Sequence, residues 1–234
     1  GIRDRDVTGV QTCALPIFIE WKIMSDTWNQ FDYFPSSVYT LSKPEFLDSV
    51  EKVAKVYLTN IKKEVELDKI YPIYQSYGFS QEESISDFVS YVAQTSWNIL
   101  SSQGFDMSSK ETFITEMWAH EYYKYGSMDY HSHSMGSQIT GFYILKAPKD
   151  CSRIIIYDPR PGKIQMNFGS NMRDQIHNST DIINFEPEPG LLMFTNSWLP
   201  HAFSRNRSDQ PFTFMHFNIG VRDYYPPPPP AEVI

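Results

Sequence analysis

The stretch ITGFYIL, residues 139–145, follows the triplet HSH, residues 131–133, and this order decides the fold of the second half of the chain. The seven residues form an almost continuous apolar run, which is typical of a strand buried on both faces. In an extended segment, side chains at positions i and i+2 point to the same face. His131 and His133 are therefore expected to present two imidazoles side by side at the entrance to a buried strand.

Other short strand-like segments surround this stretch. Glycine, proline, asparagine and aspartate separate these segments, as they do in proteins built from many short strands. The pattern favours two antiparallel sheets arranged as a sandwich or barrel. The sequence predicts strands at residues 112–119, 138–146, 152–157, 163–168, 180–185, 191–195 and 211–221.

Helical periodicity precedes the strands. Residues 42–45, SKPE, are typical of a helix start, with a serine cap, a proline in the first turn and an early acid. Apolar residues then recur at intervals of three and four as far as Ile61. A second such face runs from Ile85 to Trp97, and Gly104 is expected to end that helix. Both helices are expected on one outer face of the β-rich part, joined by a packed aromatic connection over residues 71–79.

The composition excludes several classes of function. The chain has 234 residues, a net charge of -8 and 15% aromatic residues, with a pI near 5.2. This balance argues against nucleic-acid binding through a basic surface. There is no run of about 20 apolar residues, so we expect no membrane-spanning helix. Two cysteines cannot form a disulfide framework, which indicates a reducing, cytoplasmic setting.

The two ends of the chain are expected to lie outside the domain. Residues 7–17, VTGVQTCALPI, resemble a translated sequencing adapter, so residues 1–23 are interpreted as a non-native extension with Met24 near the natural start. A genuine but irregular N-terminus is the alternative. Residues 24–225 then form one domain, with a helical part at 24–110 and a β core at 111–225. The proline-rich tail, 226–234, is expected to be a polyproline II stub, either solvated or bound by a partner.

His201 supplies the third ligand of a candidate metal site. It follows the predicted strand GLLMF, residues 190–194, and a loop that carries the chain back toward the mouth of the barrel. Three protein ligands on one face of a metal leave its other positions open for reactants. Imidazole binds iron, zinc, copper or nickel, so the ligands alone do not select the metal. Asp129 is the alternative third ligand, and the remaining histidines are expected in the core or on the surface: His120, His177 and His216.

A series of blocks around these histidines resembles one known family. In order, the blocks are HSH at 131–133, TGFYIL at 140–145, YDPR at 157–160, PGLLMF at 189–194, WLPH at 198–201 and FNI at 217–219. They resemble the 2-oxoglutarate and iron(II)-dependent oxygenases carried by phages and bacteria, over roughly residues 112–221. The resemblance implies a double-stranded β-helix, or jelly roll, with helices packed on one face. It implies Fe(II), 2-oxoglutarate and O2 as metal and cosubstrates, and His131, His133 and His201 as metal ligands and catalytic residues.

The sequence departs from the family at two positions. Most of the wider superfamily has an acid where His133 stands. The family also has an arginine some ten residues beyond the last histidine, to bind the far carboxylate of 2-oxoglutarate, but residues 210–213 read QPFT. Other residues are therefore candidates for binding the cosubstrate: Tyr143, Arg160, Arg205, Arg207 and Asn218. Each also has a structural interpretation, as a core tyrosine, a turn cap, two loop charges and a strand-end cap respectively.

The resemblance implies an enzyme that hydroxylates an unidentified substrate and releases succinate and CO2. The substrate would be a small molecule or the side chain of a peptide or protein, and the setting the cytoplasm of a bacterium or of a phage-infected host. One alternative is a three-histidine iron dioxygenase of cupin type that needs no 2-oxoglutarate, which the absent arginine favours. The other is a non-catalytic jelly-roll module that binds a partner or belongs to a virion. The oligomeric state is left open.

Overall fold

The computed structural model describes residue 29 and residues 32–133, 136–165 and 175–225. The chain divides into two compact units, residues 1–35 and 36–234, and every described helix and strand belongs to the second. The predictions for residues 1–23 and 226–234 lie outside the described residues. None of the described helices combines the length and the apolar character needed to cross a membrane.

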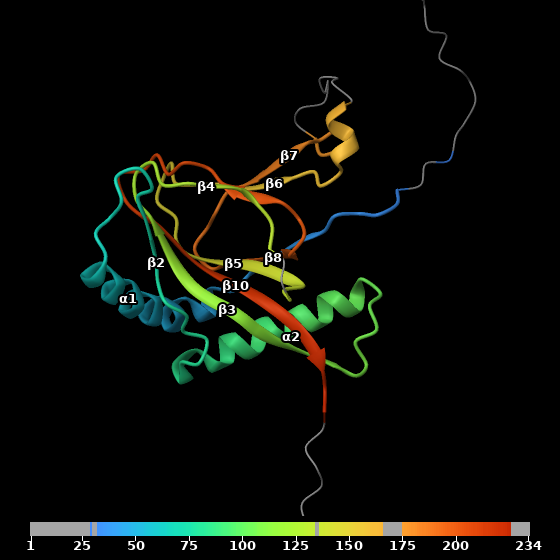
Figure 1. The fold of residues 1–234 in the computed structure, drawn as a ribbon, viewed down its shortest axis with the longest axis horizontal. Coiled ribbons are helices and arrows are strands. Elements are labelled where there is room, and N and C mark those ends of the chain that lie inside the picture. The colour runs from blue at the N-terminus through green and yellow to red at the C-terminus, as the bar shows by residue number, and fades with distance from the viewer. Residues whose placement is uncertain (1–28, 30–31, 134–135, 166–174, 226–234) are drawn as a thin grey trace, which may run out of the picture. The chain divides into compact units, whose positions relative to one another are not determined.

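Two antiparallel sheets face each other in the second unit (Figure 1). The larger one contains, in spatial order, β1 (Val38–Ser42), β8 (Leu191–Asn196), β5 (Ile139–Lys146), β10 (Phe212–Asp223), β3 (Lys110–Tyr122) and β2 (Ile73–Gln75). The smaller one contains β4 (Met128–His131), β9 (His201–Phe203), β6 (Ile154–Tyr157) and β7 (Ile182–Phe185). This arrangement confirms the predicted mostly-β architecture of two facing sheets.

Two helices cover the face of the larger sheet that points away from the smaller sheet (Figure 1). They are α1 (Leu47–Glu64) and α2 (Ser86–Ser102), as the periodicity predicted. Their apolar faces pack on the sheet, because no other surface is available to bury them. Gly104 ends α2 as expected, with a φ of +92° that favours glycine. Short 3-10 turns complete the elements: η1 (Pro44–Phe46), η2 (Glu83–Ile85) and η3 (Pro161–Gln165).

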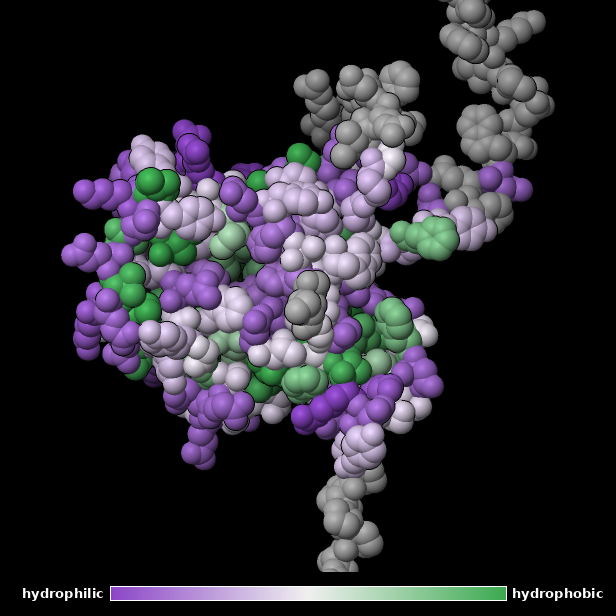
Figure 2. All heavy atoms as spheres, in the orientation of Figure 1, coloured by the Kyte–Doolittle hydropathy of each residue, from purple (hydrophilic) through white to green (hydrophobic). Residues whose placement is uncertain are grey.

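The larger sheet is buried on both faces, which explains its continuous apolar strands. Along β10, Met215, Phe217 and Ile219 pack in the core shared with the helices, whereas Phe212 and Phe214 pack in the core between the sheets. Because side chains alternate along a strand, His216 and Asn218 lie on the face that points at the smaller sheet. On the outer face of the molecule shown in Figure 2, the described residues are mostly hydrophilic, and hydrophobic ones gather only in small groups.

Several local predictions were wrong. Ser42 ends β1 and caps no helix; Pro44 begins a 3-10 turn instead, and no side chain caps the start of α1. The predicted strand at 163–168 is wrong where the structure describes it, because residues 161–165 form η3. Lys163 holds this turn through Asp158 at 3.0 Å and Asp181 at 2.8 Å. Four short strands were not predicted: β1, β2, β4 and β9.

Gly141, in the middle of β5, is expected to tolerate no side chain. A Cβ there would lie 2.5 Å from the backbone oxygen of Met193 and 2.2 Å from the ring of Phe217. The carbonyl belongs to the neighbouring strand β8 and cannot move without breaking the ladder. We expect Gly141→Ala to lower the free energy of unfolding by about 3 kcal/mol in urea denaturation. Gly162→Ala is the control, because nothing lies within 4 Å of its Cβ; equal losses in both variants would contradict the packing argument.

Candidate metal centre

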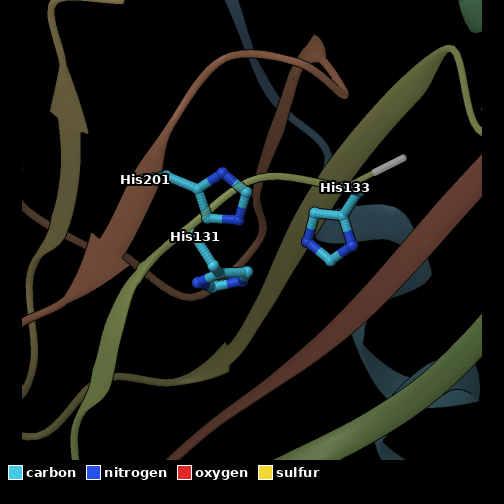
Figure 3. Close-up of side chains that lie close together, drawn as sticks. All are labelled: His131, His133 and His201. Atoms are coloured by element: carbon cyan, nitrogen blue, oxygen red, sulfur yellow. The ribbon is translucent and has the colours of Figure 1, made fainter.

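The structure brings His131, His133 and His201 together at one end of the smaller sheet (Figure 3). His131 ends β4 and pairs directly with His201, the first residue of β9. Two residues on, His133 donates its backbone N–H to the Ser197 oxygen at 2.8 Å, which ties it to the turn before β9. The ring centroids lie 4.4 to 5.1 Å apart, and one nitrogen of each ring lies within 4.8 Å of the others.

Backbone carbonyls select the tautomer of two of the three rings. His131 Nδ1 lies 2.7 Å from the Asp129 oxygen, and His201 Nδ1 lies 3.1 Å from the Leu199 oxygen. A carbonyl only accepts hydrogen bonds, so each Nδ1 carries the hydrogen and each Nε2 keeps a lone pair. Among the described residues, Nε2 of His201 and of His133 is buried and has no partner. A metal ion would satisfy these nitrogens, so the donor set fits Fe(II).

Burial keeps the ligands in the form that binds a metal. Desolvation lowers the pKa of His201 to about 3 and that of His133 to about 4, and the charge of His131 lowers both further. Both rings are therefore neutral at pH 7, as a metal-binding imidazole must be. Asp129, the alternative ligand, is exposed and does not belong to the cluster.

Asn218 contacts the third ligand from β10. Its Nδ2 lies 3.2 Å from His133 Nδ1 and donates to Glu116 Oε2 at 2.6 Å. When His133 binds a metal through Nε2, its Nδ1 carries a hydrogen, which the Asn218 amide oxygen would accept if the amide turned and gave up its Nδ2 bond to Glu116. That oxygen is buried and has no partner among the described residues. The contact places Asn218 beside His133, where its amide can orient the ring.

We expect Asn218→Ala to raise the dissociation constant for Co(II) by about 10- to 100-fold, as the loss of a group that orients a ligand does. Equilibrium titration of the metal-free protein measures this constant. Asn98→Ala is the matched control, because Asn98 is exposed on α2, where its side chain accepts a hydrogen bond from Gln94. Unchanged affinity in Asn218→Ala would show that His133 needs no partner at Nδ1.

Comparison with known proteins gives one family match, and the matched segment includes this site. Residues 116–218 match the family described as "Putative 2OG-Fe(II) oxygenase". Over this segment the chain is similar to 2OG-Fe(II) oxygenases. The segment contains all three histidines, and enzymes of the family use Fe(II), 2-oxoglutarate and O2. Among curated protein sequences, none matches the chain.

Similar solved structures have the same fold at low sequence identity. A prolyl-4-hydroxylase from Pseudomonas putida has a TM-score of 0.54 and 11% identity, covering 81% of this chain and 94% of that one. AviO1 from Streptomyces viridochromogenes Tue57 has a TM-score of 0.57 and 8% identity, covering 82% and 93%. The epimerase SnoN, in complex with Fe3+, alpha ketoglutarate and nogalamycin RO, has a TM-score of 0.54 and 10% identity, covering 81% and 82%. These likenesses confirm the jelly-roll fold.

Tyr143 does not reach the histidine cluster. Along β5, Phe142 packs between the sheets, so Tyr143 must face the helices. Its hydroxyl donates to the Lys43 oxygen at 2.6 Å, and its ring packs on Phe88. Burial among these groups raises the pKa of the Tyr143 phenol well above its usual value. The interpretation of Tyr143 as a cosubstrate ligand was wrong, and the core interpretation holds.

The three candidate arginines differ in where they lie relative to the histidines. Arg160 is exposed and binds Asp158 through Nε at 2.9 Å and Nη2 at 2.7 Å, so it caps a turn. Arg205 and Arg207 lie beyond the end of β9 opposite to His201, where they line a surface cavity of about 580 Å³. Arg205 and Arg207 are thus separated from the histidine cluster by the length of β9, whereas Arg160 follows the end of β6 that pairs with His201 and has its side chain bonded to Asp158.

Two histidines outside the triad lie in the core, as the sequence analysis allowed, but their position beside the triad was not predicted. His120 on β3 and His216 on β10 are 5% and 3% exposed. The His216 ring stacks on His133 at 4.7 Å and lies 6.3 Å from His120. The alternation along the strand could have indicated this position. Met215 and Phe217 face the helices, so His216 between them must face the smaller sheet and the triad.

Proposed function

We propose that the chain is a hydroxylase in which His131, His133 and His201 hold Fe(II). The proposed reaction consumes 2-oxoglutarate, O2 and a C–H bond of the substrate, and it yields succinate, CO2 and a C–OH group. Bound iron would supply O2 activation at the coordination positions that the protein leaves open. The observation that carries the proposal is the cluster of three imidazole nitrogens within 4.8 Å, inside the segment that matches the family.

The chain's own groups would orient the ligands and exclude water. The carbonyls of Asp129 and Leu199 hold two rings in the binding tautomer. Phe142 covers the inner side of His201, with ring centroids 5.2 Å apart. His131 and His133 are only half-buried, so reactants would approach the metal from their side. A dry inner wall with one open side is the arrangement that protects a reactive oxidant.

The substrate is proposed to be a small molecule or the side chain of a peptide or protein. Two aromatic side chains near the ligands support contact with an organic substrate rather than an ion: Trp198 is 50% exposed in the turn before β9, and Tyr130 is 60% exposed next to His131. Among similar folds are a prolyl-4-hydroxylase and an epimerase from nogalamycin biosynthesis, which span both substrate classes. The scarcity of cysteine favours a cytoplasmic setting.

Succinate formation tests the proposal. The purified chain with Fe(II), ascorbate, 2-oxoglutarate and O2 is expected to form succinate slowly even without a substrate. Absence of succinate together with O2 consumption on a thiol or diol would instead support the cupin-type dioxygenase. That second candidate is favoured by one observation, that no lysine or arginine is buried among the described residues. A protein that retains no iron, cobalt or zinc would rule out both enzymes.

A further inference from the structure

The deep interior between the sheets offers a carboxylate no cation. Among the described residues, the buried polar groups include histidine, serine, threonine and asparagine, but no lysine or arginine. Phe212, in the segment 210–213 where the resemblance implies an arginine, packs against Tyr122 and Phe203 with ring centroids 6.2 Å apart. A carboxylate placed among these rings would lose its hydration without gaining a partner. A buried anion must therefore be held closer to the metal centre.

His120 and His216 are the polar groups next to the metal centre on that side. They stand on neighbouring strands, where His216 pairs with Trp118 and His120 pairs with Phe214. His216 stacks on the ligand His133, and His120 lies one ring further in. Among the described residues, only His131, His133 and His201 form a group of three or more potential metal ligands. His120 and His216 therefore do not belong to a second such group.

The hydrogen-bond pattern leaves His120 with a buried donor. The indole N–H of Trp118 donates to His120 Nε2 at 2.5 Å, and an indole can only donate. Nδ1 of the neutral His120 ring must then carry its hydrogen, yet it is buried with no partner among the described residues. Nδ1 of His216 is also buried without a partner, while its Nε2 lies 3.1 Å from the Thr140 hydroxyl. Such groups are costly to leave unsatisfied, which points to a ligand that completes them.

We propose that His120 and His216 bind the distal carboxylate of 2-oxoglutarate, in the role that an arginine has elsewhere in the family. The inference rests on the proposed function, because it takes 2-oxoglutarate as the cosubstrate of this site. The carboxylate would accept hydrogen bonds from the imidazole edges, and Trp118 and Phe214 hold the two rings in place by stacking. With this pair as the carboxylate-binding group, 2-oxoglutarate can be the cosubstrate although residues 210–213 contain no arginine.

A comparison of two oxo acids isolates the distal carboxylate. 2-Oxopentanoate has the same keto acid end as 2-oxoglutarate but a methyl group in place of the far carboxylate. Both are titrated without oxygen into the full chain loaded with Co(II), in the wild type and in His120→Phe and His216→Phe. Binding is followed by calorimetry, and metal content is measured in each sample. His120→Asn and His216→Asn keep an N–H donor near the position of Nδ1, and His177→Phe is a histidine control away from the site.

The wild type is expected to bind 2-oxoglutarate more tightly than 2-oxopentanoate. In each phenylalanine variant the ratio of the two dissociation constants should fall by at least about tenfold, while the metal content stays the same. The asparagine variants should recover part of this preference, which a purely structural role would not produce. An unchanged preference in the phenylalanine variants would overturn this inference alone. If the metal-loaded wild type binds neither oxo acid, the proposed function fails, and this inference with it. Should one phenylalanine variant fail to fold, the preference measured in the other decides.

Discussion

His201→Ala is expected to abolish metal retention. Loss of a group that only supports a ligand lowers metal affinity by up to about 100-fold, so loss of the ligand itself should lower the affinity for Fe(II) or Co(II) by more than that. His201 is the most buried ligand and pairs directly with His131, so its loss leaves two half-buried imidazoles that cannot enclose an ion. Its backbone bonds to β6 do not involve the side chain, so the fold should remain. Metal analysis after desalting measures the loss, and far-ultraviolet circular dichroism checks the β-sheet content.

The control for this change is His177→Ala, which removes a histidine before β7, outside the cluster. It should retain metal at the wild-type ratio. Stoichiometric metal in His201→Ala would show that the ion is held by other groups. Loss of metal in both variants would instead point to adventitious binding by histidine.

The metal-free protein is expected to lose several kcal/mol of stability between pH 6.5 and pH 5. Burial lowers the pKa of His120 and His201 to about 3, and it lowers that of His216 well below 6.5. In the unfolded chain these groups take up protons near pH 6.5. Below that pH the unfolded state binds more protons than the folded one, so the free energy of unfolding falls by about 1.4 kcal/mol per pH unit for each group. Above about pH 7.5 both states are deprotonated and the effect vanishes.

Urea denaturation from pH 7.5 to pH 5 measures this dependence. The window excludes the carboxylates, whose titration begins at lower pH. His120→Phe should reduce the slope by the contribution of one group, and bound Co(II) should offset the loss by stabilising the folded state. A urea midpoint that stays constant from pH 7.5 to pH 5 would show that these histidines are hydrated in the folded state.

The sequence predicted the elements whose signals are local. A short window of sequence was enough to predict three features. These are the buried strand at 139–145, the two amphipathic helices, and the side-by-side position of His131 and His133. Strands of three or four residues, such as β9, were missed because they form only when a partner strand is present. The proposed carboxylate-binding pair, His120 and His216, did not stand out in the sequence because the search favoured charged residues, whereas these two are buried histidines on strands.

The residues around the triad could have been found by following alternation along the strands. On β10, the positions between Met215 and Ile219 that face away from the helices are His216 and Asn218, and both contact His133. Alternation along a strand does not predict which strands are neighbours in the sheet. That order brings β3 next to β10, and so His120 near His216, over about 100 residues of chain. Pairing at such separation depends on the whole fold rather than on any one segment.

The central claim is that His131, His133 and His201 hold Fe(II) in a site that also takes 2-oxoglutarate. Anaerobic addition of Fe(II) and then 2-oxoglutarate, followed by visible absorption spectroscopy, tests it most directly. A charge-transfer band should appear only after the oxo acid is added, saturate at one equivalent of iron, and be absent in His201→Ala. Stoichiometric iron binding with no such band at saturating 2-oxoglutarate would contradict the account.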